Sequence, residues 1–157
     1  MDFEQLFEEH HAHLVRLAGL LTGSNDQAQD IVADVFARLM RRPPGQMDDP
    51  RAYLRRCVVN EVNSVGRRLA RRARLGASAE APANPPMIDG PIAERDRIAR
   101  ALAELPRQQR AVLVLRYFED LSEAQTATLL RVPAGTVKSA SSRGATRLRE
   151  LLREEHP

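Results

Sequence analysis

Apolar residues recur every three or four positions in three stretches of the first half of the chain, at residues 2–21, 28–40 and 50–74. This spacing puts the apolar side chains on one face of a helix, so each stretch is predicted to be an amphipathic α-helix. Gly23 is a natural stop for the first helix, and Pro50 suits the first turn of the third. The first half is therefore predicted to be a unit of three helices.

A proline-rich segment separates this unit from the second half of the chain. Residues 76–93 hold four prolines and little that could pack, which predicts an extended linker. Beyond it, the apolar pattern predicts one helix that ends at Leu105 and another over residues 108–118, with a proline-marked break between them. The chain is thus predicted to be an all-α protein, with two small helical domains (1–75 and 94–157) joined by an extended Pro-rich linker.

The C-terminal part of the chain has the pattern of a helix-turn-helix. Ser122 and Gln125 have the spacing of a capping box, which predicts the start of a short helix that ends at Leu130. A turn at Arg131 and Val132 follows, and a longer helix begins directly after it. This is the most specific local signal in the sequence.

Side chains around the predicted turn fit the same motif. The small Ala127 allows two helices to approach closely, Leu130 and Val132 can cover the turn, and Val137 falls on the inward face of the second helix. Arg131 stands where the motif usually has glycine. We expect it to adopt a left-handed conformation at a cost of roughly 1–2 kcal/mol.

The outward face of the second helix of this motif is rich in cations and hydroxyls. Lys and Arg can donate to guanine acceptors in the major groove, and Ser and Thr can reach phosphates or base edges. This face therefore favours a DNA-reading surface, with a solvated basic face on an ordinary helical hairpin as the alternative. The predicted DNA contacts are Thr136, Lys138, Ser139, Ser142, Arg143 and Arg147.

Charge is segregated along the chain, although the net charge is only +3. Residues 1–50 carry nine acidic and four basic side chains, whereas residues 51–75 carry eight arginines and the single acid Glu61. Such an arginine-rich strip indicates either a solvated helix face or a surface that binds a polyanion, here nucleic acid. The strip alone does not decide between the two.

Composition narrows the class of protein further. Aromatic residues make up 4% of the chain and Trp is absent, which argues against a large β-sheet core. Cys57 is the only cysteine, and no apolar run approaches the ~20 residues of a membrane span. With no signal peptide visible at the start of the sequence, we expect a cytoplasmic protein without membrane contact. Lys138 is the only lysine, a bias typical of a GC-rich genome.

No catalytic motif occurs in the sequence. It has no phosphate-binding glycine loop, nucleophile elbow or zinc-protease motif, so an enzyme is not expected. His10, His11 and His13 cluster, but nothing nearby completes a metal site, and ordinary surface histidines are the preferred interpretation. Cys57 lies in an apolar stripe and is expected to pack rather than to sense redox state. We therefore expect no cofactor and no metal.

Three segments resemble a known family. Residues 102–152, with LPRQQRAVLVLRYFEDLS followed by GTVKS, resemble region four of extracytoplasmic-function (ECF) sigma factors of the actinobacterial type, group 4 of the sigma-70 family. FEEHHAHLVRLAGLLTGSNDQAQDIVADVFARLMRR (7–42) and DDPRAYLRRCVVNEVNSVGRRLARR (48–72) resemble the two ends of region two. The resemblance implies a sigma factor that binds core RNA polymerase and directs promoter-specific transcription.

The resemblance also implies which residues bind the polymerase. In the family, the second helix of region two docks on the clamp coiled coil of the largest subunit, and region four binds the flap of the second largest subunit. The corresponding residues for the clamp are Asp30, Ile31, Asp34, Val35 and Arg38. For Ile31 and Val35, a place in the core is the preferred alternative. Whether an anti-sigma factor also binds this chain stays open.

Promoter contacts are implied in both domains. Region two opens the minus-ten element through a loop at about residues 41–49 and one helix face, which corresponds to Asn60, Asn63, Arg67 and Arg68. Region four reads the minus-thirty-five element through the six outward side chains of the helix-turn-helix. Many relatives have Trp near Gly66 or Arg67, so the details of duplex melting are expected to differ in this chain. Many relatives also have Arg where this chain has Ala140, so fewer cationic contacts and an altered promoter preference are expected.

Two other functions are weighed against the sigma factor. A stand-alone helix-turn-helix regulator would use the first domain for dimerisation or sensing, and would bind operator DNA without polymerase. A degenerate sigma-like protein would instead sequester an anti-sigma factor, with Arg131 and Ala140 as the motivation. Binding to core polymerase separates the sigma factor from the first of these.

Overall fold

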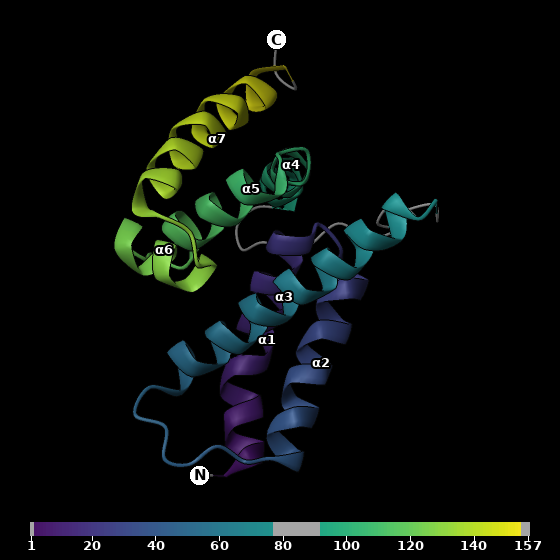
Figure 1. The fold of residues 1–157 in the computed structure, drawn as a ribbon, viewed down its shortest axis with the longest axis vertical. Coiled ribbons are helices and arrows are strands. Elements are labelled where there is room, and N and C mark those ends of the chain that lie inside the picture. The colour runs from purple at the N-terminus through teal and green to yellow at the C-terminus, as the bar shows by residue number, and fades with distance from the viewer. Residues whose placement is uncertain (1, 77–91, 155–157) are drawn as a thin grey trace.

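The computed structural model describes residues 2–76 and 92–154, and this part of the chain is helical throughout, without strands (Figure 1). The helices are α1 (Phe3–Thr22), α2 (Asn25–Arg41), α3 (Pro50–Arg74), α4 (Ile92–Ala103), α5 (Arg107–Leu113), the π-helical turn η1 (Val114–Phe118), α6 (Glu123–Leu130) and α7 (Ala134–Glu154). The prediction of an all-α protein is confirmed. Most of the predicted linker lies outside the described residues.

The first half forms a three-helix unit, as predicted. Each helix begins at a side-chain cap: Asp2, Ser24 and Asp49 accept hydrogen bonds from the backbone of the first turns of α1, α2 and α3. Gly23 ends α1 in the left-handed region at φ 77°, and Pro50 occupies the first turn of α3. These local signals explain why the helix ends could be predicted.

The second half is built around α5 and η1, which pack against other elements on several sides. Four consecutive residues, 112–115, are at most 2% exposed. Such a run of buried residues shows that this helix is covered on all sides. Its neighbours are α7, which packs on α5, and α1, which contacts both α5 and η1. Gly144 permits the close approach of α7, because a Cβ there would lie 3.1 Å from Leu113 Cδ1.

One predicted helix differs in detail. Residues 108–118 were expected to form a single regular helix, but the chain widens into the π-helical turn after Leu113. The Glu119 amide donates to the Val114 carbonyl, five residues earlier, instead of to the residue four earlier. Directly after this turn, Asp120 adopts a left-handed conformation at φ 57°. Both changes redirect the chain toward α6.

The two halves pack directly on each other. One continuous cluster of buried apolar residues runs from Leu6 and Leu14 in α1 to Leu102, Leu115 and Leu151 in the second half. In addition, α1 contacts α4, α5 and η1, and α3 contacts α6 (Figure 1). The sequence predicted two domains but gave no indication of their relative placement.

Candidate nucleic-acid interface

The helix-turn-helix forms as its local sequence predicts. The Ser122 hydroxyl accepts from the Gln125 amide at 3.0 Å, and the Gln125 side chain accepts from the Ser122 amide at 2.9 Å, which completes the capping box. Arg131 ends α6 in the left-handed region at φ 59° and ψ 45°. The predicted cap and the predicted strained turn are both confirmed.

A small core fixes the angle between α6 and α7. Val112, Ala127, Val137 and Ala140 are buried together, and Leu130 and Val132 pack against them. Ala127 and Val137 therefore have their predicted roles. The expectation for Ala140 was wrong: it is 6% exposed, so it belongs to this core and not to a DNA-facing surface.

The opposite face of α7 is open to solvent. Lys138, Ser139, Ser142 and Arg143 are exposed, and Thr136 at the start of the helix is half-buried. These side chains occupy the first half of a 21-residue helix, next to the turn. Such a helix end, with cations and hydroxyls on one face and a buried stripe on the other, can enter a major groove.

Arg147 lies one helical turn further from the turn of the motif. It is exposed and forms ion pairs with Glu150 at 3.3 Å and with Glu154 at 3.8 Å. Exposed pairs of this kind are weak, so the guanidinium can exchange them for a phosphate. Arg147 thus lies farther from the turn than the other five predicted DNA contacts.

A second polar surface lies on α3. Asn60, Arg67 and Arg68 are exposed, and Asn63 is half-buried. Arg68 reaches the Glu61 carboxylate at 3.5 Å. The structure thus brings the four predicted minus-ten residues onto one helix, but only three of them are freely accessible.

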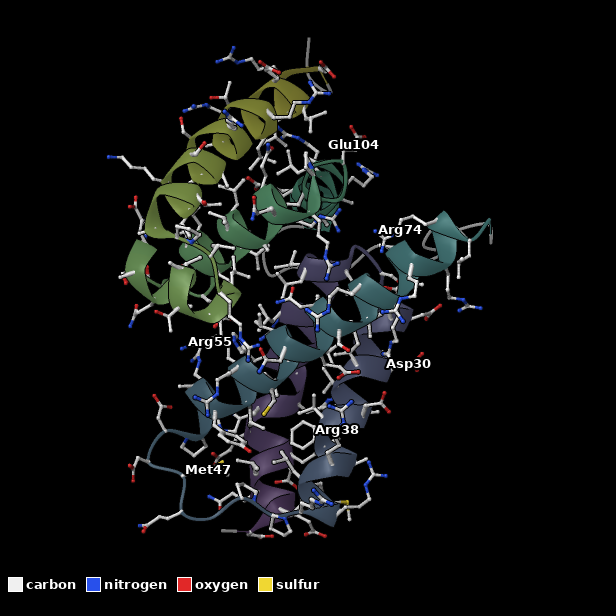
Figure 2. All side chains as sticks on the ribbon, viewed as in Figure 1. Asp30, Arg38, Met47, Arg55, Arg74 and Glu104 are labelled. Atoms are coloured by element: carbon white, nitrogen blue, oxygen red, sulfur yellow. The ribbon has the colours of Figure 1, made fainter. Side chains whose placement is uncertain are left out.

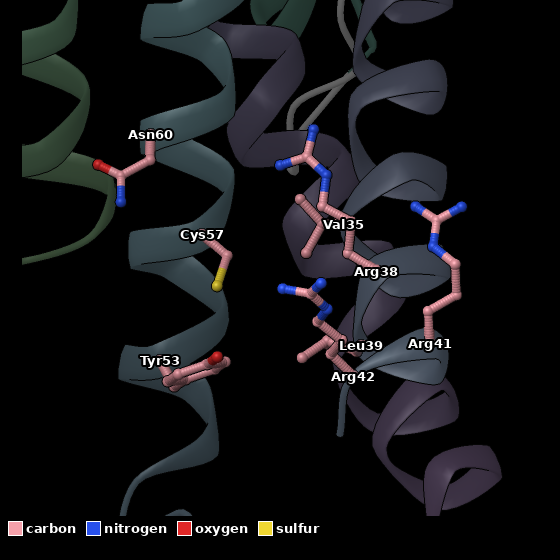
Figure 3. A pocket seen from close by; sticks show the side chains of 8 residues that line it. All are labelled: Val35, Arg38, Leu39, Arg41, Arg42, Tyr53, Cys57 and Asn60. Carbon is pink, nitrogen blue, oxygen red and sulfur yellow. The ribbon is translucent and has the colours of Figure 1, made fainter. Parts of the chain in front are cut away.

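A cleft of about 660 Å³ opens between α2 and α3, beside Asn60 (Figure 3). From α2, Arg38 and Arg42 extend toward α3, and Tyr53 and Cys57 line the opposite wall (Figure 3). Cations beside an aromatic ring suit an unpaired nucleotide, since the cations attract its phosphate and the ring offers a stacking surface. Tyr53 also packs partly against the core, because its spacing places it on the apolar stripe of α3.

Burial sets the chemistry of the thiol in this cleft. Cys57 is half-buried, and burial raises the pKa of its thiol, against the lowering effect of the Tyr53 hydrogen bond and of the nearby Arg56 and Arg38. A thiol with a raised pKa is neutral near pH 7 and a poor nucleophile. This agrees with a packing role for Cys57.

The predicted polymerase-binding residues divide into two groups. Asp30, Asp34 and Arg38 are exposed, and Asp30 points away from α2 into solvent (Figure 2). Ile31 and Val35 are each 3% exposed, so they belong to the core, which was the preferred alternative for these two residues. Their burial excludes them from a docking surface. Arg38 is held by a buried carboxylate, Glu61, at 2.7 Å.

The clustered histidines have different surroundings. His11 stacks on Phe7 at 4.4 Å between ring centroids, and His13 lies 2.6 Å from the Glu119 carboxylate. Within the described residues, no group of three His, Cys, Asp or Glu side chains could hold a metal ion. The pairing of His13 was not predicted, because its partner belongs to the other half of the chain. Across residues 2–76 and 92–154, no helix is long and apolar enough to cross a membrane.

Known proteins of the same architecture share both halves. The family model of Sigma-70 region 2 matches residues 6–74, and that of Sigma-70 region 4 matches residues 95–148. The ECF RNA polymerase sigma factor SigM of Mycobacterium tuberculosis is 36% identical over 96% of this chain and 76% of its own length. The RNA polymerase sigma-E factor of Streptomyces coelicolor is 34% identical over 97% of this chain and 86% of its own.

A solved structure agrees over nearly the whole chain. The sigma factor RpoE from Bartonella quintana, in complex with the anti-sigma factor NepR, superposes with a TM-score of 0.78 at 27% identity and covers 97% of both chains. CnrH, in complex with the cytosolic domain of CnrY, gives a TM-score of 0.63 at 25% identity over 97% of this chain and 88% of its own.

The fold combines a helix-turn-helix that has an exposed cationic face with a helical unit that contains a basic helix. This combination is typical of DNA-binding transcription proteins. More specifically, the chain belongs to the sigma-70 family and, within it, to the ECF sigma factors. It is a promoter-directing RNA polymerase sigma factor that contains sigma-70 regions 2 and 4. The alternative of a stand-alone regulator is not favoured.

Proposed function

We propose that this sigma factor reads the minus-thirty-five element through the exposed first half of α7. The observation that carries the proposal is the separation of faces on this helix: Val137 and Ala140 are buried, while Lys138, Ser139 and Arg143 are exposed. Lys138 and Arg143 donate to guanine acceptors, and the hydroxyls contact bases or phosphates. The proposed contacts are Thr136, Lys138, Ser139, Ser142, Arg143 and Arg147.

In region 2, the proposed minus-ten surface joins the α3 face to the cleft beside it. Asn60 stands at the edge of the cleft, and its amide points away from the cleft (Figure 3), where it can bond a neighbouring unpaired base. Within the cleft, Arg42 meets the phosphate of a nucleotide and Tyr53 its base. Further along α3, Asn63, Arg67 and Arg68 continue the contact with the strand. We assign residues 1–75 to region 2, 76–93 to the linker and 94–157 to region 4.

Core RNA polymerase is the partner that supplies the chemistry, and the sigma factor itself is not an enzyme. We propose that Asp30 and Asp34 on the outer side of α2 face the clamp coiled coil of the largest subunit, with Arg38 beside them, and that region 4 binds the flap. Since the similar sigma factor RpoE is bound by an anti-sigma factor, a comparable regulator is proposed here. Because core polymerase is the proposed partner, the proposed location of the protein is the cytoplasm.

Transcription in a purified system tests the DNA assignments. A promoter is first found by mapping transcripts after forced expression of the chain, and it is then transcribed with core polymerase. The double variant Lys138→Ala/Arg143→Ala should reduce promoter-specific transcripts by about 10²-fold, since each bidentate base contact contributes about 1–3 kcal/mol. Binding to core polymerase should be unchanged.

A control variant of equal charge makes the result specific. Arg100→Ala/Arg153→Ala also removes two positive charges, but from exposed positions on α4 and at the end of α7. It should keep most of the activity. If Lys138→Ala/Arg143→Ala transcribes the promoter as well as this control, the assignment of the α7 face is refuted.

A further inference from the structure

Lys138 is the only lysine in a chain with 24 basic side chains, and all the others are arginines. A guanidinium stays protonated under physiological conditions and is a poor nucleophile, whereas the amine of a lysine is an ordinary target of acylation. The sequence therefore offers amine-directed chemistry a single side chain. This side chain lies on the α7 face that is proposed to read the minus-thirty-five element.

The surroundings of Lys138 leave its amine accessible. The side chain is exposed, and within the described residues it forms no hydrogen bond and no ion pair. On a helix, the nearest neighbours of a side chain stand three and four positions away. For this lysine they are all small: Ala134, Gly135, Ser141 and Ser142. A Cβ at position 135 would meet nothing within 4 Å, so a reagent can approach the amine from this side.

The charge around Lys138 favours anionic reagents. Residues 124–149 contain no acidic side chain but five cations, Arg131, Lys138, Arg143, Arg147 and Arg149. Of these, Arg131, Lys138 and Arg143 are exposed around the turn and the first half of α7. A surface of one sign raises the local concentration of ligands of the opposite sign. Acyl phosphates and coenzyme A thioesters both carry phosphate groups, so this surface attracts them as it attracts the DNA backbone.

We propose that Lys138 is an acylation site, and that its modification by a phosphate-bearing acyl donor stops this sigma factor from reading the minus-thirty-five element. The first part of the proposal depends on the access to the side chain and on the charge around it. The second part rests on the proposed function, in which Lys138 donates to a guanine acceptor.

The reaction balances without a further reactant. The neutral amine of Lys138 attacks the carbonyl carbon of the acyl group, and an N–C amide bond forms. The bond from this carbon to the phosphate oxygen, or to the sulfur of coenzyme A, breaks. Phosphate or the thiolate leaves with the electron pair, and the proton released by the nitrogen passes to this leaving group or to water. No atom is oxidised or reduced.

Acylation removes what Lys138 offers to DNA. The ammonium group carries a positive charge and three N–H donors, whereas the amide that replaces it is neutral and keeps a single N–H. One good base contact corresponds to about tenfold or more in discrimination, so promoter-specific transcription should fall by about that factor. Because the chain has no other lysine, a single modified side chain would produce the whole effect.

Mass spectrometry of the purified full chain tests the site. The protein is incubated with acetyl phosphate in one arm and with acetyl-coenzyme A in another, and the acetylated positions are mapped after proteolysis. Lys138 should be acetylated in at least one arm. The ratio of its modification to that of the α-amine should be several-fold higher than with p-nitrophenyl acetate, an uncharged donor, and inorganic phosphate should lower it. No acetylation of Lys138, or an equal ratio for charged and uncharged donors, would overturn the proposal.

Two substitutions at Gly135 separate charge from access. Gly135→Glu places a carboxylate three positions before the lysine, where an ion pair can engage the amine. Gly135→Gln adds a side chain of the same shape without the charge. The phosphate-bearing donors should acetylate Lys138 several-fold more slowly in Gly135→Glu than in Gly135→Gln. Equal rates in the two variants would contradict the role of an unpaired amine on a positive surface.

Transcription with core polymerase tests the consequence, after the donor has been removed. The acetylated wild type should give about tenfold fewer promoter-specific transcripts than the untreated protein. Lys138→Arg keeps the charge but cannot accept the acyl group, so treatment with the donor should not change its activity; a loss in this variant would assign the effect to the α-amine and overturn the role of Lys138.

Unchanged transcription by the acetylated wild type would likewise overturn the regulatory role. The double variant Lys138→Ala/Arg143→Ala then shows where the failure lies. If this variant is also fully active, the proposed DNA contacts of α7 are wrong. If it is inactive, the DNA contacts stand, and acetylation of Lys138 does not control them. Neither result alters the position mapped by mass spectrometry.

Discussion

The exposed Arg38 of α2 is held in place by the buried carboxylate of Glu61 on α3: Nη2 of the arginine lies 2.7 Å from Oε2 of the carboxylate. The Glu61 side chain is 6% exposed, and its other oxygen lies 3.5 Å from Arg68. One buried acid therefore orients a cation of the proposed polymerase surface and a cation of the proposed minus-ten surface.

Replacement of this acid should cost stability. Glu61→Gln keeps the shape of the side chain but removes its charge, and we expect the free energy of unfolding to fall by about 1 kcal/mol in urea denaturation. This value lies at the low end for charged hydrogen bonds, because Arg38 and Arg68 are more than half exposed and screened by solvent. Glu150→Gln, which breaks only a surface pair, should change stability by less than about 0.5 kcal/mol. Equal effects of the two variants would contradict this role of Glu61.

Relief of strain at the turn of the helix-turn-helix should have the opposite effect. Arg131 has φ 59°, a conformation that costs a residue with a Cβ about 1 kcal/mol relative to glycine. We therefore expect Arg131→Gly to raise the free energy of unfolding by about 1 kcal/mol. Arg131→Ala removes the same charge but keeps the strain, so thermal melts should show no comparable gain; if they do, the gain comes from charge.

A buried hydroxyl in α6 offers a second stabilising change. Thr126 is 0% exposed, and within the described part of the chain its Oγ1 has no hydrogen-bond partner. An unsatisfied buried polar group costs about 1–3 kcal/mol, so Thr126→Val should raise the unfolding free energy by about 1 kcal/mol. The control is Thr128→Val, at an exposed hydroxyl that donates to the Ala124 carbonyl at 3.0 Å. A loss of stability in Thr126→Val alone would show that its hydroxyl has a partner.

Features encoded by neighbouring residues could be predicted from the sequence. The capping box of Ser122 and Gln125 and the left-handed Arg131 depend on a few adjacent positions, and both occur as expected. The burial of Ala140 could also have been predicted from the spacing of the residues around it. It follows Val137 by three residues and precedes Gly144 by four, which places all three on one helix face, yet comparison with arginine in relatives outweighed this spacing.

Features that depend on the packing of distant segments could not be predicted. His13 and Glu119 belong to different regions, and nothing in the local sequence of either residue indicates that they meet. Nothing in the local sequence explains the glycine at position 66, because the side chain that needs the space, Arg107, comes from region 4. The sequence therefore predicted the helices and the helix-turn-helix, whereas the contacts between the two regions required the structure.

The ionisation of Glu119 should make the packing of the two halves on each other sensitive to acid. Burial alone would raise the pKa of this carboxyl, but the hydrogen bond and charge of His13, together with Arg55 and Arg51, outweigh burial and lower the pKa below its usual value of 4.5. These groups face Glu119 from α1 and α3. Because the pKa is lowered while the halves are packed together, ionised Glu119 stabilises this packing fully above pH 4.5, and this contribution is lost as the pH falls through the lowered pKa.

The radius of gyration should accordingly stay constant from pH 7 to about pH 5 and increase as the pH is lowered further, while far-UV circular dichroism still reports helices. Glu119→Gln cannot titrate at this position, so its radius should show no transition of this origin in the same range. The difference between the two proteins isolates Glu119 from the other carboxyls, which protonate in both. If the wild type and Glu119→Gln expand at the same pH and to the same extent, other carboxyls control the expansion, and the ion pair with His13 and Arg55 does not stabilise the packing of the two halves.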